Sequence, residues 1–235
     1  MKKNNTIKTL CLAAAMFFGA FAANAQIEQT IYLNGSVPTA EFGQSVNLRT
    51  SPSLGLMGRD TVGKGATAGF GLGYRISYHF DIGYGEVSPF ANIDVQWNRL
   101  KSSYRDQYTL ASADKPEYFN IPMMVGVNYR YGLTDIIKVF GEFGVGFDIF
   151  NITAEGWGGS ETSPYYYRYD VGNAMAWELG AGAYLNDYFS AGLYYYALGK
   201  HAISYDSHSH LLNGEPTSPI LRNIGSLALR LGFHF

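Results

Sequence analysis

The last ten residues, SLALRLGFHF at positions 226–235, alternate between large apolar side chains and smaller or polar ones. Leucine or phenylalanine stands at every second position from Leu227 to Phe235, and Arg230 and His234 lie between them. This alternation is typical of a β-strand with one apolar face and one polar face. No polar residue follows Phe235 in the sequence, so we expect the apolar face to lie against something other than water.

The first 25 residues have the pattern of a secretory signal peptide. Lysines at positions 2, 3 and 8 precede the apolar run LCLAAAMFFGAFAA, and Ala23 and Ala25 form a small-x-small cleavage pattern before Gln26. We therefore expect residues 1–25 to be removed and residues 26–235 to form the mature domain. Cys11, the only cysteine, lies in this leader, so the exported chain is expected to fold without disulfides.

The charge of the mature chain argues against nucleic acid as a partner. The sequence has 17 basic and 19 acidic residues, and three of the lysines lie in the leader. The mature chain therefore has 14 basic against 19 acidic residues, a formal net charge of −5. A protein that binds a nucleic-acid duplex needs a basic face, which this composition does not favour.

Eight segments of the mature chain alternate with a period of two residues. Most of them have about ten residues or more, which is the length that a tilted strand needs to cross a bilayer. No stretch after the leader is apolar over the length of a membrane helix, but alternating strands do not need one. The segments are residues 29–37, 68–80, 90–100, 119–131, 137–149, 171–185, 188–200 and 226–235.

The connections between these segments alternate strictly in length. Residues 42–65, 101–117, 153–167 and 201–218 form long connections, whereas residues 81–85, 132–135 and 186–187 form short ones. A meander with both chain ends on the side of the short turns has this pattern. Outer-membrane barrels are built in this way, with short periplasmic turns and longer extracellular loops.

Three stretches carry a resemblance to a known family: YFNIPMMVGVNYRY at 118–131, VFGEFGVGFDI at 139–149 and AWELGAGAYLNDYFSAGLYY at 176–195. They resemble the small bacterial outer-membrane beta-barrel domain proteins of the porin-like superfamily, which include the eight-stranded OmpA-, OmpX- and OmpW-type barrels. The resemblance implies an all-β, eight-stranded antiparallel up-and-down transmembrane β-barrel over residues 26–235. It also implies an integral protein of the outer membrane with extracellular loops and both mature termini in the periplasm.

The same resemblance implies the partners. They are outer-membrane lipid and lipopolysaccharide, the barrel-assembly machinery and an unknown extracellular ligand held by the loops. In this family an alternating last strand that ends in phenylalanine helps the assembly machinery to recognise the chain, which assigns Phe233 and Phe235 to the assembly signal. A closed barrel also accounts for the exposed apolar face, because that face would lie against lipid.

An eight-stranded barrel is barely wide enough for its own side chains. Glycines and charged residues both fall on the predicted inner face, and buried charges must be paired. Counting along the hairpins places Arg75 opposite Asp94 and Arg130 near Glu142, and Glu178 and Arg230 can complete the network. We interpret this set as a structural plug, with an ion path or gated pore as the alternative: Arg75, Asp94, Arg130, Glu142, Asp148, Glu178 and Arg230.

Two further features of the strands have structural explanations. Pro122 has no N–H group to donate, so we expect a bulge near it. Aromatic residues near strand ends or on the outward face are expected to form the girdle that barrels place at the membrane interfaces. They are Trp97, Tyr129, Tyr131, Trp177 and Tyr188. For the loop aromatics Trp157 and 165–167, interface anchoring or loop packing is favoured over stacking on carbohydrate.

The segment KHAISYDSHSH, residues 200–210, invites comparison with barrels that modify the acyl chains of lipopolysaccharide with a His and a Ser. His201, Ser204, His208, Ser209 and His210 do not reproduce that motif, and a flexible loop does not preorganise a base and a nucleophile. His208 and His210 alone make a weak metal site. We therefore predict no catalytic residue, no metal and no cofactor.

The sequence thus predicts a non-catalytic outer-membrane barrel that displays four extracellular loops for surface interaction or envelope integrity. Three alternatives stay open. The first is a narrow pore for small or apolar solutes, the second is a lipid A-modifying enzyme, and the third is a soluble lipocalin-like carrier with an apolar interior.

Overall fold

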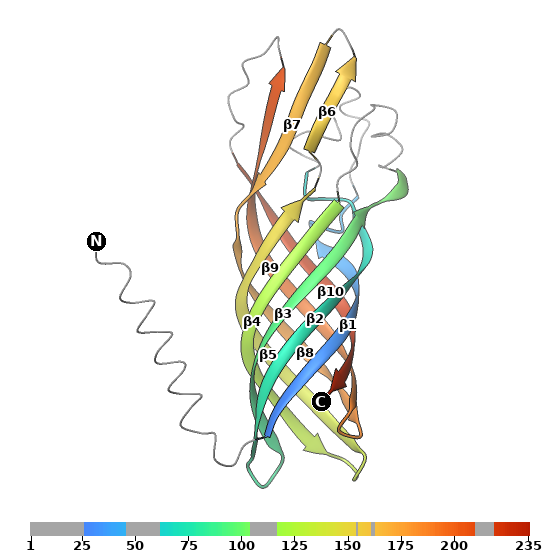
Figure 1. Ribbon diagram of the computed structural model, residues 1–235, viewed down its shortest axis with the longest axis vertical. Coiled ribbons are helices and arrows are strands. Elements are labelled where there is room, and N and C mark those ends of the chain that lie inside the picture. Colours follow the sequence, from blue (N-terminus) through green and yellow to red (C-terminus); the bar gives the residue numbers. More distant parts are fainter. Residues whose placement is uncertain (1–25, 46–61, 104–116, 154, 161–162, 210–218) are drawn as a thin grey trace, which may run out of the picture.

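The computed structural model describes residues 26–45, 62–103, 117–153, 155–160, 163–209 and 219–235. These residues form ten β-strands (Figure 1): β1 Gln26–Ala40, β2 Ala66–Asp81, β3 Glu86–Leu100, β4 Glu117–Gly132, β5 Ile137–Ile152, β6 Glu155–Ser160, β7 Ser163–Val171, β8 Ala174–Leu185, β9 Phe189–Ser209 and β10 Ile220–His234. Among the described residues, no helix is long and apolar enough to cross a membrane.

Eight of these strands close into a barrel. Each pairs with its neighbour in the order β10-β1-β2-β3-β4-β5-β8-β9, and β9 pairs back with β10. All of these pairs are antiparallel. The prediction of an all-β, eight-stranded antiparallel up-and-down barrel is therefore confirmed.

The seam between the first and the last strand closes the sheet. Thr30 lies opposite His234 and Ala40 lies opposite Ile224, with unbroken register between them. On β10, Leu229 and Phe233 are 50% and 47% exposed on the outside of the barrel, whereas Arg230 between them is 4% exposed on the inside. The alternation at residues 226–235 therefore sorts apolar side chains outward and polar or small ones inward.

The prediction that residues 153–167 form a long loop is wrong. It contains β6 and β7, which pair with each other. The last part of β9 pairs with β7, so residues 201–209 belong to a strand and not to the seventh loop. Figure 1 shows this three-stranded extension rising beyond the barrel, at the end opposite the three short turns. In the sequence, the alternation within SPYYYRYDV is the feature that indicates β7, because it is the same period of two residues seen in the barrel strands.

The bulge expected near Pro122 is also wrong. Met123 pairs with Ile93 and Asn120 pairs with Gln96, so the register between β3 and β4 is the same on both sides of the proline. The two pairs between them are missing from the ladder with β3, whereas Pro122 lies opposite Asp148 on the β5 side. The proline interrupts one ladder without inserting a residue.

Inward glycines allow adjacent strands and side chains to fit inside this narrow barrel. A Cβ atom added to Gly146 would collide with the backbone carbonyl oxygen of Met123, which cannot move away as a flexible side chain could. Gly35 of β1 differs, because a Cβ added there meets no atom within 4 Å.

We predict that Gly146→Val lowers the free energy of unfolding by about 1–3 kcal/mol or prevents folding, because the added atoms overpack the interior. Gly35→Val is the matched control and should leave stability nearly unchanged. The measurement is the urea midpoint of the refolded barrel in detergent micelles. Equal midpoints for the two variants would contradict the assigned inward face of Gly146.

Candidate functional site

The middle of the barrel interior holds a cluster of two arginines and three carboxylates. Arg75 of β2 donates from Nη1 to Oε2 of Glu142 on β5 at 2.7 Å, and its Nη2 contacts the other carboxylate oxygen. Arg230 of β10 lies within 3.3 Å of Glu178 on β8, 3.5 Å of Glu142 and 3.6 Å of Asp94 on β3. Their side chains are at most 5% exposed. Buried charges are stable only when paired in this way.

Asparagine side chains donate further hydrogen bonds to the three carboxylates. Asn128 donates to Glu142 at 2.7 Å, Asn92 donates to Glu178 at 2.8 Å and Asn34 donates to Asp94 at 2.7 Å. These bonds hold each carboxylate in one orientation, because charge-assisted hydrogen bonds are the strong ones.

Three tyrosines surround Arg230. Its Cζ atom lies 4.0 Å from the ring centroid of Tyr32 and 3.8 Å from that of Tyr194, and one guanidinium nitrogen donates to the hydroxyl of Tyr196. A guanidinium packed between aromatic faces gains cation–π attraction. Arg230 therefore contacts all three carboxylates of the cluster as well as these three tyrosines.

The pairing of Arg75 with Asp94 that hairpin counting predicts is wrong. The register places Arg75 opposite Asn92 and Asp94 opposite Gly73. Arg75 instead crosses the interior to Glu142, on a strand that is not its neighbour. Glu178 and Arg230 do lie in the same cluster. The interior is so narrow that opposite walls touch, and counting along a hairpin considers only adjacent strands.

Arg130 belongs to a second cluster, near the short turns. It donates to both carboxylate oxygens of Glu28 at 2.9 and 2.7 Å. His234 and His79 approach the same carboxylate at 3.0 and 3.4 Å. Sequence reasoning missed Glu28 because the first strand was expected to begin at position 29, and it begins at 26.

Asp148 lies toward the other end of the interior and pairs with His201 of β9. The distance from Oδ2 of Asp148 to Nε2 of His201 is 3.1 Å, and both side chains are fully buried. The other ring nitrogen lies 2.8 Å from the carbonyl oxygen of Gly172. Each ring nitrogen thus lies within hydrogen-bond distance of an oxygen atom, and the imidazole and the carboxyl group contact each other in the interior.

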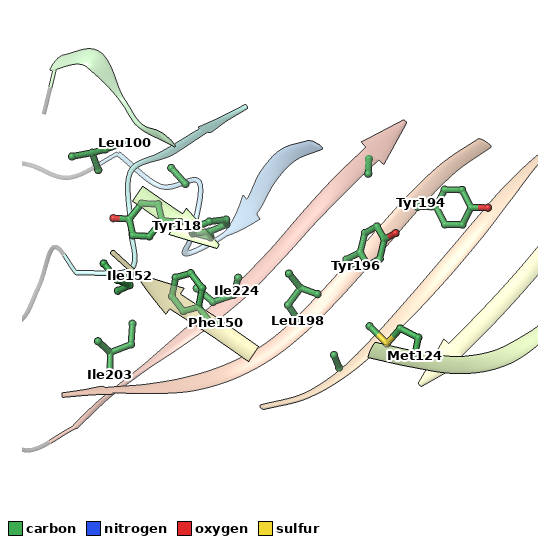
Figure 2. Packing of buried hydrophobic residues seen from close by; sticks show 14 of the residues in the cluster. Leu100, Tyr118, Met124, Phe150, Ile152, Tyr194, Tyr196, Leu198, Ile203 and Ile224 are labelled. Atoms are coloured by element: carbon green, nitrogen blue, oxygen red, sulfur yellow. The ribbon is translucent and has the colours of Figure 1, made fainter. Parts of the chain in front are cut away.

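An apolar layer packs beside this pair. The rings of Phe42, Tyr118 and Phe150 contact one another with centroid separations of 5.3, 5.7 and 5.8 Å. Ile203 and Ile224 join them and are at most 1% exposed. Figure 2 shows Tyr118, Phe150, Ile152 and Ile224 gathered beside one another, while Tyr194, Tyr196 and Leu198 follow β9.

The interior thus has three levels between the short turns and the extension: the Glu28 cluster, the central charge cluster, and the apolar layer with the Asp148–His201 pair. Asn120 lies toward the end of the barrel opposite the short turns. It is fully buried, and its side-chain amide has no hydrogen-bond partner among the described residues. Buried amides of this kind commonly bind water. The ion pairs and apolar side chains of these three levels pack against one another across the described part of the interior.

His201 and Ser204 do not form a catalytic pair. His201 points into the interior, whereas Ser204 is three positions along the same strand and therefore on the opposite face, where it donates to the carbonyl oxygen of Asp170. The side chains of His208 and Ser209, and all of His210, lie outside what the structure describes. Among the described residues no group of three or more His, Cys, Asp or Glu side chains could hold a metal ion.

The predicted girdle residues lie on the outside of the barrel at two levels. Tyr129, Tyr131 and Tyr188 are 41%, 49% and 60% exposed near the short turns. Trp97 and Trp177 lie nearer the other end, where Trp97 packs against Phe70 with ring centroids 5.0 Å apart.

The remaining predicted site residues lie at the edges of the described chain. Phe233 and Phe235 are 47% and 56% exposed outward on the last strand. Gln26 begins β1, whereas Ala23 and Ala25 lie outside the described residues. Trp157 of β6 pairs in register with Tyr166 of β7.

No protein-family model and no curated protein matches the chain. Solved structures that are similar include Neisserial surface protein A, at 10% identity over 90% of this chain and 98% of that one, with a TM-score of 0.45. The outer membrane protein OprG from Pseudomonas aeruginosa has 13% identity over 91% and 96%, with a TM-score of 0.47. Ail, the attachment invasion locus protein of Yersinia pestis, has 12% identity over 89% and 97%, with a TM-score of 0.40.

We predict that Arg230→Met lowers the free energy of unfolding by about 3–5 kcal/mol, because it leaves buried carboxylates without their cation. Lys138→Met is the control. Lys138 pairs with Glu86 at 3.0 Å and with Asp187 at 3.1 Å, but its side chain is 30% exposed. Its removal should therefore cost less than about 1 kcal/mol. Urea unfolding of both refolded variants tests this, and similar losses would show that the central cluster does not stabilise the barrel.

Proposed function

We propose that this chain is a non-catalytic, integral barrel of the bacterial outer membrane that presents a rigid surface structure to the outside. Its mechanism is display, in which the closed sheet fixes the bases of the surface segments and those segments carry the recognition. The barrel itself performs no chemistry in this proposal.

The distribution of side chains supports the membrane placement. Outward positions around the barrel carry large apolar residues that are about half exposed, such as Leu72, Val125, Leu193 and Leu229. The interior carries the charges. A soluble carrier with the lipocalin-like arrangement needs the reverse, an apolar interior and a polar exterior, whereas a membrane barrel needs this one. Patches of this extent on a water-soluble protein would cause association.

The asymmetry of the two ends supports the orientation. The chain makes only short turns after β2, β4 and β8, and β1 begins and β10 ends on that same side (Figure 1). The strand ends that the long connections join, and the β6–β7 hairpin, lie at the other end. We place the short turns in the periplasm and the hairpin outside the cell, as outer-membrane barrels do.

The extension formed by β6, β7 and the end of β9 is the observation that carries the proposal. β9 is a single strand of 21 residues. It pairs with β8 and β10 in the wall of the barrel, and beyond the barrel it pairs with β7. β7 leads into β8 after two residues, so the extension continues the wall of the barrel. A ligand-binding segment built on such strands is held more firmly than one on a free loop.

We expect that removing the β6–β7 hairpin, which forms most of the extension, abolishes recognition and leaves the barrel folded. The variant replaces residues 154–172 with Asn-Gly, two residues that favour a turn, in a shortened connection between β5 and β8. Bacteria that display each form are compared for binding to immobilised glycans and extracellular-matrix proteins. Binding should fall at least tenfold, while the folded barrel still shows a heat-modifiable band on a gel.

Deletion of residues 104–116, in a different long connection, is the control and should keep most of the binding. If the intact protein binds none of these surfaces, or if the two deletions reduce binding equally, the display role of the extension is contradicted.

A further inference from the structure

A recess lies in the outer wall of the barrel, across β4, β5, β8 and β9. It has a volume of about 630 Å³ and its lining is almost wholly apolar. The outward residues that line it include Tyr129, Gly141, Phe143, Leu179, Ala181 and Leu193, and Leu227 of β10 lies at its margin.

The strand register explains why the wall is hollow there. Tyr129, Gly141, Ala181 and Leu193 lie opposite one another in a single row across four strands, so two small residues stand between two large ones. A Cβ atom added to Gly141 meets nothing within 4 Å. Phe143 and Leu179 pair in the next row and form one side of the hollow.

The recess lies just inside the aromatic residues at the end with the short turns. Tyr131, 49% exposed, is two positions beyond Tyr129 on β4, a separation of about 7 Å along a strand. Tyrosines at this level mark the membrane interface in barrels. The recess therefore begins where the first part of a lipid acyl chain would lie.

We infer that this recess binds one acyl chain of a glycerophospholipid from the periplasmic leaflet. The inference rests on the membrane placement and orientation proposed above, which put the short turns in the periplasm. An acyl chain is apolar, linear and flexible, and the charged side chain nearest the floor, Glu142, is directed into the barrel interior.

A second copy of the chain fits the recess less well. In a twofold contact whose axis passes through the recess, one hollow would face the other and neither would be filled. The acyl chains of lipid A have the same chemistry, but the proposed orientation places that lipid in the leaflet at the other end of the barrel.

The test fills the recess without touching the interior. Gly141→Leu puts a side chain into the hollow, and Gly35→Leu is the matched control, because Gly35 is also an outward glycine with open space around it. Ala181→Phe fills the hollow from the neighbouring strand if Gly141→Leu fails to fold. Each protein is refolded into nanodiscs of phosphatidylethanolamine with lipid A present and released for native mass spectrometry.

We expect wild type and Gly35→Leu to retain one phosphatidylethanolamine, and the retained fraction to fall at least tenfold in Gly141→Leu or Ala181→Phe. Equal retention in all variants would overturn the inference. So would retention of lipid A instead, or a wild-type dimer that Gly141→Leu dissociates. Failure of the wild type to insert into nanodiscs would instead refute the membrane placement, which separates the two proposals.

Discussion

Closure of the sheet between β1 and β10 is the constraint on which the rest of the structure depends. Inside a bilayer no water is available for unpaired backbone groups, so a sheet can span it only without free edges. The register from Thr30 opposite His234 to Ala40 opposite Ile224 meets that demand. Closing only eight strands makes the interior narrow, which explains why Gly146 and Gly182 stand where a Cβ would collide with backbone carbonyl oxygens of the next strand.

The narrow interior in turn determines what the protein can do. Opposite walls lie close enough for Arg75 to reach Glu142 and for Arg130 to reach Glu28, so the charges pair across the barrel instead of lining a channel. The apolar layer of Phe42, Tyr118 and Phe150 packs beside them. The proposed display function therefore assigns recognition to the extension beyond the barrel and not to the interior.

The sequence was sufficient to predict the architecture because strand alternation is a local signal. The eight barrel strands, their inward and outward faces and the three short turns followed from a period of two residues. The hairpin of β6 and β7 did not, because its glycine-rich first strand, EGWGGS, hides the alternation. The ion pairs could not be predicted either. They join strands that are not neighbours, and their partners depend on the register and on the width of the closed barrel.

Single-channel conductance of the refolded mature chain in a planar bilayer tests the filled interior most directly. A folded barrel is confirmed in the same sample by its heat-modifiable band on a gel. If the charge clusters and the apolar layer close the interior, the bilayer stays silent. Discrete, reproducible current steps that change when Arg75 or Glu142 is substituted would contradict the account and would make the barrel a pore.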